Sequence, residues 1–376
     1  MTKVAATRSS DKARLPWVEH LVSRPLDAAV EAERFTAHLY RGSMSNQSTL
    51  QILEHMAEKL TTKHQPANRK KDSEPQKKSD DPLVYLSENI HATREHLVRA
   101  LASLSNSEIQ ELRKKIVSQT TKEITTGHRF GGEDHGARLV DLMLRVDLNE
   151  ILNAGRQLGD LTLADFIQKL ERFYQKKSNR SVLREMRTPD GVILIGGEGP
   201  NVYRLDQSVN VCAVIDFGGD DIYDEGSVTA GRPVVVIIDL GGNDIYRGRS
   251  LAIQGSAILG ASLLYDRAGD DTYKATDLAQ GSSLVGVGIL LDEAGDDSYM
   301  GDRRVQGQST GGFGILIDRS GHDQYRAALL SQGVGGPLGA GLLLDQNGND
   351  RYFAGGKYVD SYEDSPGFGG WSQGVG

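Results

Sequence analysis

Paired aspartates recur at a fixed spacing through the second half of the 376-residue sequence, in the pattern Asp-x-x-Gly-x-Asp-x-Tyr. Each copy places two carboxylates around one glycine turn. Carboxylate and carbonyl oxygens are the ligands that Ca²⁺ prefers in proteins. The sequence therefore predicts a metal-ligand role, with calcium as the ion, for the aspartates of six motifs: Asp216, Asp221, Asp239, Asp244, Asp266, Asp271, Asp292, Asp297, Asp318, Asp323, Asp345 and Asp350.

The same pattern also has a purely structural interpretation. An aspartate can accept hydrogen bonds from the backbone amides of its own turn, while the glycine three residues later supplies a positive φ. Stacked copies would place carboxylates about 5 Å apart, where neighbours repel by roughly 3 kcal/mol at an effective dielectric of about 20. Either the turn amides or a bound cation must offset this repulsion, and both alternatives stay open.

The motif marks a longer repeat. Its first aspartates are spaced by 23, 27, 26, 26 and 27 residues, and a degenerate earlier copy begins at Gly196, with Asn201 in place of the second aspartate. Units of this length, with glycine corners and no helical segment, are typical of a parallel β-solenoid, in which each strand pairs with its equivalents in neighbouring coils. The sequence predicts about seven coils of 23–27 residues.

Two further columns follow from the same register. The tyrosine slot predicts a stacked ladder or, as a sharper alternative, an aromatic ribbon that binds sugar rings. The Gln-Gly corners at Gln254, Gln280, Gln306 and Gln332 predict an amide ladder. The strands before each motif are apolar or small on both faces, so they should be covered on both sides, by the helical half, by another sheet or by a partner subunit.

The first half of the chain has helical periodicity over 14–63, 83–123 and 137–177. Residues 61–81 have almost no apolar side chain and several lysines. We therefore predict an α+β chain with a helical N-terminal segment, a flexible basic linker, a helical domain and a β-solenoid domain, at 1–60, 61–81, 82–188 and 189–376. The net charge is +6 before residue 189 and -14 after it, which fits docking of the two halves or a basic half that meets an anionic partner.

An insertion interrupts the last repeat. The interval from the motif tyrosine to the Gln-Gly corner is 7 or 8 residues in four units, but 21 residues from Tyr352 to Gln373. Insertions in repeat proteins project from one edge and often carry function. We therefore take Lys357, Tyr358, Asp360, Tyr362 and Trp371 as ligand-binding candidates. The phase of the repeat also predicts that the array continues past Gly376, so that the sequence stops inside a coil.

The stretch LGGNDIYRG, residues 240–248, resembles the loops of RTX-type calcium-binding β-rolls, whose G-G-x-G-x-D-x-U-x turns hold calcium between stacked coils. The resemblance implies calcium at the aspartate turns. It is local, because only Asp216 and Asp239 precede a Gly-Gly pair and the turns here recur about every 26 residues. The repeated D-x-x-G-x-D-x-Y and Q-G slots also look like those of an uncharacterised bacterial β-solenoid repeat protein.

Three classes of function fit these features. We favour a non-enzymatic binding or scaffold protein that presents a solenoid surface to a glycan or protein partner. A carbohydrate-active enzyme, a polysaccharide lyase or hydrolase on a β-helix, is the alternative, because such enzymes use carboxylate pairs. An acidic rod that mimics DNA is the third hypothesis.

Other features narrow the partners. The sequence has no nucleotide-binding motif, nucleophile elbow or Cys/His triad, and its lysine-rich segment lacks the interleaved aromatics of a nucleic-acid site. No stretch of 18 apolar residues predicts a transmembrane helix. An uncovered solenoid face or edge would allow a homo-oligomer.

The single Cys212 does not indicate the cellular compartment. We favour an extracytoplasmic location over a cytoplasmic one, although the first residues contain no apolar run of signal-peptide length.

Overall fold

The computed structural model describes residues 16–45, 48–60, 79–126, 133–175, 184–359, 368–369 and 372. Its helices occupy the first half of the chain: α2 (Pro16–Ser23), α3 (Ala28–Ser43), α4 (Ser48–Leu60), α5 (Pro82–Ala100), α6 (Asn106–Thr126), α7 (Glu133–Leu144), α8 (Leu148–Asp160) and α9 (Ala164–Gln175). Local signals fix some helix starts. Asp81 caps α5 by accepting from the amide of Leu83 at 2.9 Å, and Pro82 follows at the first helical position. No helix among these residues is both long and apolar enough to span a bilayer.

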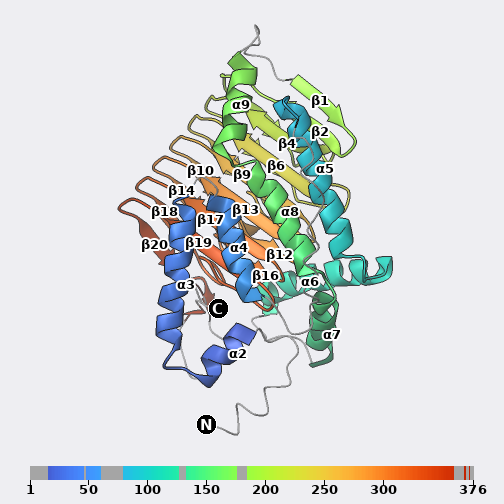
Figure 1. The fold of residues 1–376 in the computed structure, drawn as a ribbon, viewed down its shortest axis with the longest axis vertical. Coiled ribbons are helices and arrows are strands. Elements are labelled where there is room, and N and C mark those ends of the chain that lie inside the picture. Colours follow the sequence, from blue (N-terminus) through green and yellow to red (C-terminus); the bar gives the residue numbers. More distant parts are fainter. Residues whose placement is uncertain are drawn as a thin grey trace.

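The second half forms a parallel β-solenoid of about five turns (Figure 1). One side, which we call the long sheet, runs in the order β1-β2-β4-β6-β9-β13-β17-β19 and is parallel from β2 onward. Its strands are β1 (Arg184–Thr188), β2 (Gly191–Ile195), β4 (Val211–Asp216), β6 (Val234–Asp239), β9 (Ala261–Asp266), β13 (Val287–Asp292), β17 (Phe313–Asp318) and β19 (Ala340–Asp345).

The second side carries the motif tyrosines, and we call it the tyrosine sheet. It runs in the order β20-β18-β14-β10-β7-β5-β3 and is parallel throughout. Its strands are β3 (Val202–Arg204), β5 (Ile222–Asp224), β7 (Ile245–Arg247), β10 (Thr272–Lys274), β14 (Ser298–Met300), β18 (Gln324–Ala327) and β20 (Arg351–Ala354). The aspartate motif is the turn that leads from the long sheet into this one.

A third side closes the inner coils. It consists of the short strands β8 (Ala257–Ile258), β12 (Ser283–Leu284) and β16 (Ser309–Thr310), with a further pair formed by β11 (Asp277–Ala279) and β15 (Arg303–Val305). The units that follow β3 and β5 return to the long sheet without such a strand. The sequence predicted about seven coils, and the structure does not match that number. Each motif tyrosine indicates one strand of the tyrosine sheet, whether or not a third side closes the coil.

The helical half covers the outer face of the long sheet (Figure 1). Helix α4 contacts β19, α5 contacts β6 and β9, and α8 contacts β9 and β13. A Cβ on Gly155 of α8 would lie 3.3 Å from Val287 Cγ2 in β13 and 3.2 Å from Leu53 Cδ1 in α4, so the packing is close. Buried residues of both halves form one hydrophobic cluster. Of the three covers considered for the long strands, the structure shows the helical half.

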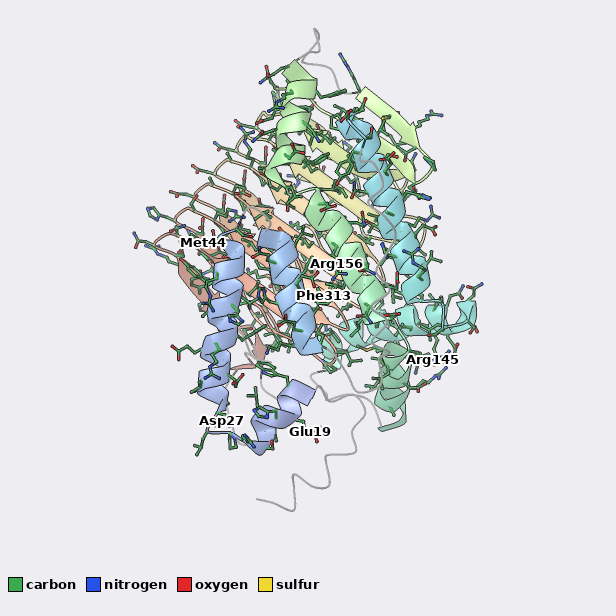
Figure 2. The ribbon with its side chains drawn as sticks, viewed as in Figure 1. Glu19, Asp27, Met44, Arg145, Arg156 and Phe313 are labelled. Atoms are coloured by element: carbon green, nitrogen blue, oxygen red, sulfur yellow. The ribbon has the colours of Figure 1, made fainter. Side chains whose placement is uncertain are left out.

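Polar contacts join the same elements. Figure 2 places Arg156 on α8, where its Nε donates to Glu54 Oε1 of α4 at 2.6 Å. Between the halves, Arg94 Nη1 of α5 lies 2.8 Å from Asp190 Oδ1, and the Ser43 carbonyl of α3 accepts from Arg319 Nη1 at 3.1 Å. The Arg94–Asp190 pair joins a cation of the helical half to an anion of the solenoid half, whereas Arg319 is a cation of the solenoid half that donates to a carbonyl.

The two ends of the solenoid differ. The long sheet begins with β1, which pairs antiparallel to β2 and carries charged side chains, a usual protection for a sheet edge. At the other end, β21 (Tyr358–Val359) and β22 (Phe368–Gly369) form a small hairpin within the insertion. Ser372 then makes a parallel bridge with Ser331, so the chain returns to the coil register there. Residues 61–78 of the expected linker and residues 373–376 lie outside the described residues.

Candidate functional site

The motif tyrosines form a continuous ladder inside the solenoid. Neighbouring rings stack with centroids 4.6–4.8 Å apart along the whole column of Tyr203, Tyr223, Tyr246, Tyr273, Tyr299, Tyr325 and Tyr352. The rings of the first six are at most 1% exposed. The structural ladder is therefore confirmed, and buried rings cannot act as a ribbon for sugars.

The motif aspartates lie beside this ladder and form a second column, which we call the acidic row; it comprises the twelve aspartates named above as metal ligands. The first aspartate of a motif ends a long strand. In Asp239, Oδ1 accepts from the amide of Gly241 at 2.9 Å, and Oδ2 accepts from the Tyr223 hydroxyl of the preceding unit. Asp266 and Asp292 repeat the hydroxyl contact at 2.6 Å with Tyr246 and Tyr273. The predicted capping of the turn by its own amides is thus present.

The second aspartate of each motif bonds across coils. Its Oδ1 accepts from the backbone amide at the same position of the preceding unit, at 2.6 Å from Asp221 to Asp244 and from Asp244 to Asp271. The Oδ2 atoms of the second aspartates behave differently. In Asp221, Asp244, Asp271, Asp297 and Asp323 they are buried and have no hydrogen-bond partner among the residues that the structure describes. All five side chains are at most 2% exposed.

The same aspartates lie close to other carboxylates. In five triads one carboxylate oxygen from each aspartate lies within 4.8 Å of the other two: Asp216 with Asp221 and Asp239, Asp239 with Asp244 and Asp266, Asp266 with Asp271 and Asp292, Asp297 with Asp318 and Asp323, and Asp323 with Asp345 and Asp350. Each of the five triads joins one motif to the next. The structure therefore brings all twelve predicted ligands into one file that runs along the solenoid axis.

Burial dominates the electrostatics of the row. It is the largest cause that raises the pKa of Asp323 to about 7 and holds the pKa of Asp266 well above its ordinary range; the neighbouring carboxylates add to both effects. The same burial raises the pKa of Tyr246 well above its usual value, so its hydroxyl stays protonated and donates to Asp266. A row of this kind is stable when each unit holds either a shared proton or a cation between its carboxylates.

The row ends in two different ways. At its first end Asn201 replaces the second aspartate, and its Nδ2 donates to Asp216 Oδ2 at 3.3 Å. The degenerate copy thus supplies an amide donor where the others supply a carboxylate. At the other end Asp345 and Asp350 are only partly buried, so the row meets solvent beside β20.

Glycine in the motif is required by the stacking. Gly269 has a φ of +153°, and a Cβ there would overlap the carbonyl oxygen of Gly242 in the preceding coil.

The residues that follow the motif glycines form an exposed column outside the turns. The amide of Asp270 donates to Asn243 Oδ1 at 2.8 Å, and that of Asp296 donates to Asp270 Oδ1 at 2.9 Å. No repeated letter marks this column in the sequence, because its members are Asp, Asn and His in different units.

The corner glutamines do not form the expected amide ladder. Gln280 has a φ of +58°, and its Nε2 donates to the backbone carbonyls of Tyr273 at 3.0 Å and of Met300, in the next coil, at 3.2 Å. The other corner glutamines repeat this arrangement. The backbone carbonyls compete successfully for the amide donors because they lie at the same corner.

The insertion is described only in part. Lys357 Nζ contacts Asp302, and the Tyr358 ring lies 5.7 Å from the guanidinium carbon of the buried Arg303. These two candidates therefore fasten the insertion to β15 and its preceding turn. The candidates Asp360, Tyr362 and Trp371 lie outside the described residues.

The outer face of the tyrosine sheet is a second regular surface. Because the tyrosines point inward, the residues on either side of them point outward. Val202 is 51% exposed and Ile245 is 38% exposed, and Arg204, Arg247 and Lys274 are also exposed. This face has no helical cover among the described residues, in contrast to the long sheet.

Fold and site together define a β-solenoid repeat protein with a helical cover and an internal acidic row. Comparison with protein-family models, curated proteins and solved structures finds no match to this chain. Its function is therefore inferred from its own geometry.

Proposed function

We propose that this protein is a non-enzymatic binding scaffold that presents a repeat-built solenoid face to a glycan partner, with calcium neutralising its acidic row. The observation that carries the proposal is the difference between the two sheets. Helices cover the long sheet, whereas the tyrosine sheet presents an exposed surface whose columns keep one register through seven strands. A rigid, evenly spaced surface suits a partner that is itself a regular polymer.

The position of the motif carboxylates supports binding over hydrolysis. A glycosidase needs two carboxyl groups that reach the scissile bond of its substrate. The inner motif aspartates are at most 2% exposed; the first aspartates accept from turn amides and tyrosine hydroxyls, and all of them lie among other carboxylates inside the fold. The carboxylates that suggested a carbohydrate-active enzyme are therefore internal to the fold. An acidic DNA mimic needs the same carboxylates on the surface, so their burial counts against that hypothesis as well.

Calcium fits the row in ligand type and charge. The donors are all oxygens, as Ca²⁺ requires, and two carboxylates per unit balance one divalent cation. The buried Oδ2 atoms of Asp221, Asp244 and Asp271 have no hydrogen-bond partner among the described residues, and these side chains lie in triads with the first aspartates of their own and adjacent motifs. These oxygens would hold the ion, which would enter where Asp345 and Asp350 meet solvent. A proton shared within each motif is the competing way to neutralise the row.

The test of calcium is a melting experiment on the full chain after treatment with a chelator. A ligand that binds only the folded state stabilises it by about 2.7 kcal/mol per site at a concentration 100-fold above its Kd. We expect millimolar calcium to raise the melting temperature more than equimolar magnesium does, and the increase to shrink in Asp244→Asn. Identical melting curves with and without calcium would indicate that shared protons, and not calcium, neutralise the acidic row.

The binding function is tested separately with a panel of neutral and anionic glycans immobilised on a sensor surface. Binding of at least one glycan, without cleavage of its chain, supports the scaffold. Release of shortened products would instead identify an enzyme. Absence of binding to the whole panel would overturn the glycan partner.

A further inference from the structure

The charges of the solenoid are divided unevenly between its surfaces. Residues 189–376 contain 12 basic and 26 acidic side chains. Five of those basic residues flank the motif tyrosines and thus project from the outer face of the tyrosine sheet: Arg204, Arg247, Lys274, Arg326 and Arg351. Asp224 is the one acidic residue among the outward positions of these seven strands. A basic face thus lies on a rod whose net charge is strongly negative.

Four of these basic residues, all but Arg351, share one column along the solenoid axis, whereas Arg351 precedes its tyrosine and pairs with Gln324. The residues after the tyrosines pair in register from strand to strand, so that Arg247 lies between Asp224 and Lys274, and Met300 between Lys274 and Arg326. Positions in this column, which we call the basic column, repeat at about the strand spacing of 4.8 Å. Arg247 and Lys274 are therefore adjacent, whereas Asp224 separates Arg204 from Arg247 and Met300 separates Lys274 from Arg326. The adjacent tyrosine rings repeat at 4.6–4.8 Å, in agreement with this spacing.

Several of these cations are available to a ligand. Lys274, Arg326 and Arg351 make no ion pair with any other residue that the structure describes, whereas Arg247 Nε lies 2.7 Å from Asp224 Oδ1. The guanidinium of Arg326 lies 5.6 Å from the Phe353 ring centroid, which helps to hold it against the sheet. Arg204 Nη1 also lies 3.8 Å from Asp224 Oδ2, so the free positive charges of the column are those of Lys274 and Arg326.

The surroundings of the column select the shape of the ligand. On the other side of the tyrosines, the outward residues of the first five strands are Val202, Ile222, Ile245, Thr272 and Ser298, a low-relief strip of apolar and small polar groups. Next to this strip, the exposed turns carry Asp220, Asp270 and Asp296. A DNA duplex carries phosphates on both strands around a wide cylinder, so these acidic turns would repel it. A narrow single chain of sugars fits between the turns and the column.

We propose that the outer face of the tyrosine sheet binds an anionic polysaccharide extended along the solenoid axis. Its acidic groups pair with the basic column, and its sugar rings lie over the apolar strip. This inference rests on the glycan-binding function proposed above and specifies the class of glycan. The acidic row, on the inner side of the same strands, has no part in the contact.

The experiment measures binding of the full chain to chondroitin sulfate, and to the same polymer after removal of its sulfates and reduction of its carboxyl groups. The test variant is Lys274→Glu/Arg326→Glu. The control, Arg34→Glu/Lys114→Glu, makes the same change of charge at exposed helical positions of α3 and α6. Thermal unfolding of all proteins shows whether the variants are folded.

We expect the chain to bind the anionic polymer and not its neutral form. Binding should weaken on the order of tenfold in the test variant, because two attractive contacts become repulsive, and remain within about twofold of the parent in the control. It should also weaken as salt rises. Equal binding of both polymers would keep the glycan-binding function and overturn the anionic class. Tighter binding of duplex DNA through the same residues would replace the polysaccharide by nucleic acid, and absence of binding would overturn this inference.

Discussion

Replacing one aspartate in the middle of the acidic row tests whether the row retains protons in the absence of metal. Asp271→Asn is the informative change because the chain already uses asparagine in this slot at Asn201. The new Oδ1 can still accept from the amide of Asp244, now at 2.6 Å, while the new Nδ2 donates towards Asp266 and Asp292. The variant therefore mimics the protonated side chain and removes one titrating group.

The magnitude follows from the pKa. Burial, and then the charge of Asp292, raises the pKa of Asp271 to about 8. The folded state thus keeps a proton that the unfolded chain loses above about pH 4, so the stability of the parent falls as pH rises from about 4 to about 8. One retained proton gives a slope of about 1.4 kcal/mol per pH unit. Between pH 5 and pH 7 the variant should therefore gain about 3 kcal/mol relative to the parent.

The assay is chemical denaturation of chelator-treated protein at pH 5, 6, 7 and 8, followed by circular dichroism. Asp270→Asn is the matched control, because Asp270 is the neighbouring residue, is exposed, and accepts from the amide of Asp296 at 2.9 Å through an oxygen that asparagine retains. Parallel stability curves for the parent and Asp271→Asn would refute a protonated row. An equal gain in the control would show that the effect belongs to surface charge.

Two further substitutions test the parts that hold the row in place. Gly269→Ala should lower the free energy of unfolding by about 3 kcal/mol or more, since its Cβ would overlap the Gly242 carbonyl, whereas Gly231→Ala meets no atom within 4 Å; denaturation midpoints compare the two. Tyr273→Phe should cost about 1–3 kcal/mol in the same assay because Asp292 Oδ2 loses its hydroxyl donor at 2.6 Å, and an unchanged midpoint would contradict that contact.

The repeat pattern predicted the solenoid, the tyrosine ladder and the aspartate turns because identical residues in one slot must stack when coils are in register. It overestimated the number of turns, because a tyrosine mark records a strand of one sheet whether or not a third side closes the coil. It also left open which element covers the long strands. That cover depends on contacts such as Gly155 against Val287, which join residues far apart in sequence and have no local signal.

The sequence was least informative about which way side chains point. The aspartates have the same spacing whether their oxygens face solvent, a cation or their own turn, and only the paired strands place them inside. The basic column was missed for a different reason. Its slot contains arginine, aspartate, lysine, methionine and phenylalanine in different units, so no repeated letter marks it, and the net charge of -14 for this half conceals it.

The cross-coil bonds of the second aspartates all run in one direction. The amide of Asp244 is satisfied only when Asp271 arrives, and that of Asp271 only when Asp297 arrives, at 2.6 Å and 2.7 Å. A ribosome delivers these residues in the same order. Each coil therefore completes the bonds of the coil before it, so the array has a polarity: bonds of this kind satisfy the amides of a coil only from the coil that follows it in the chain.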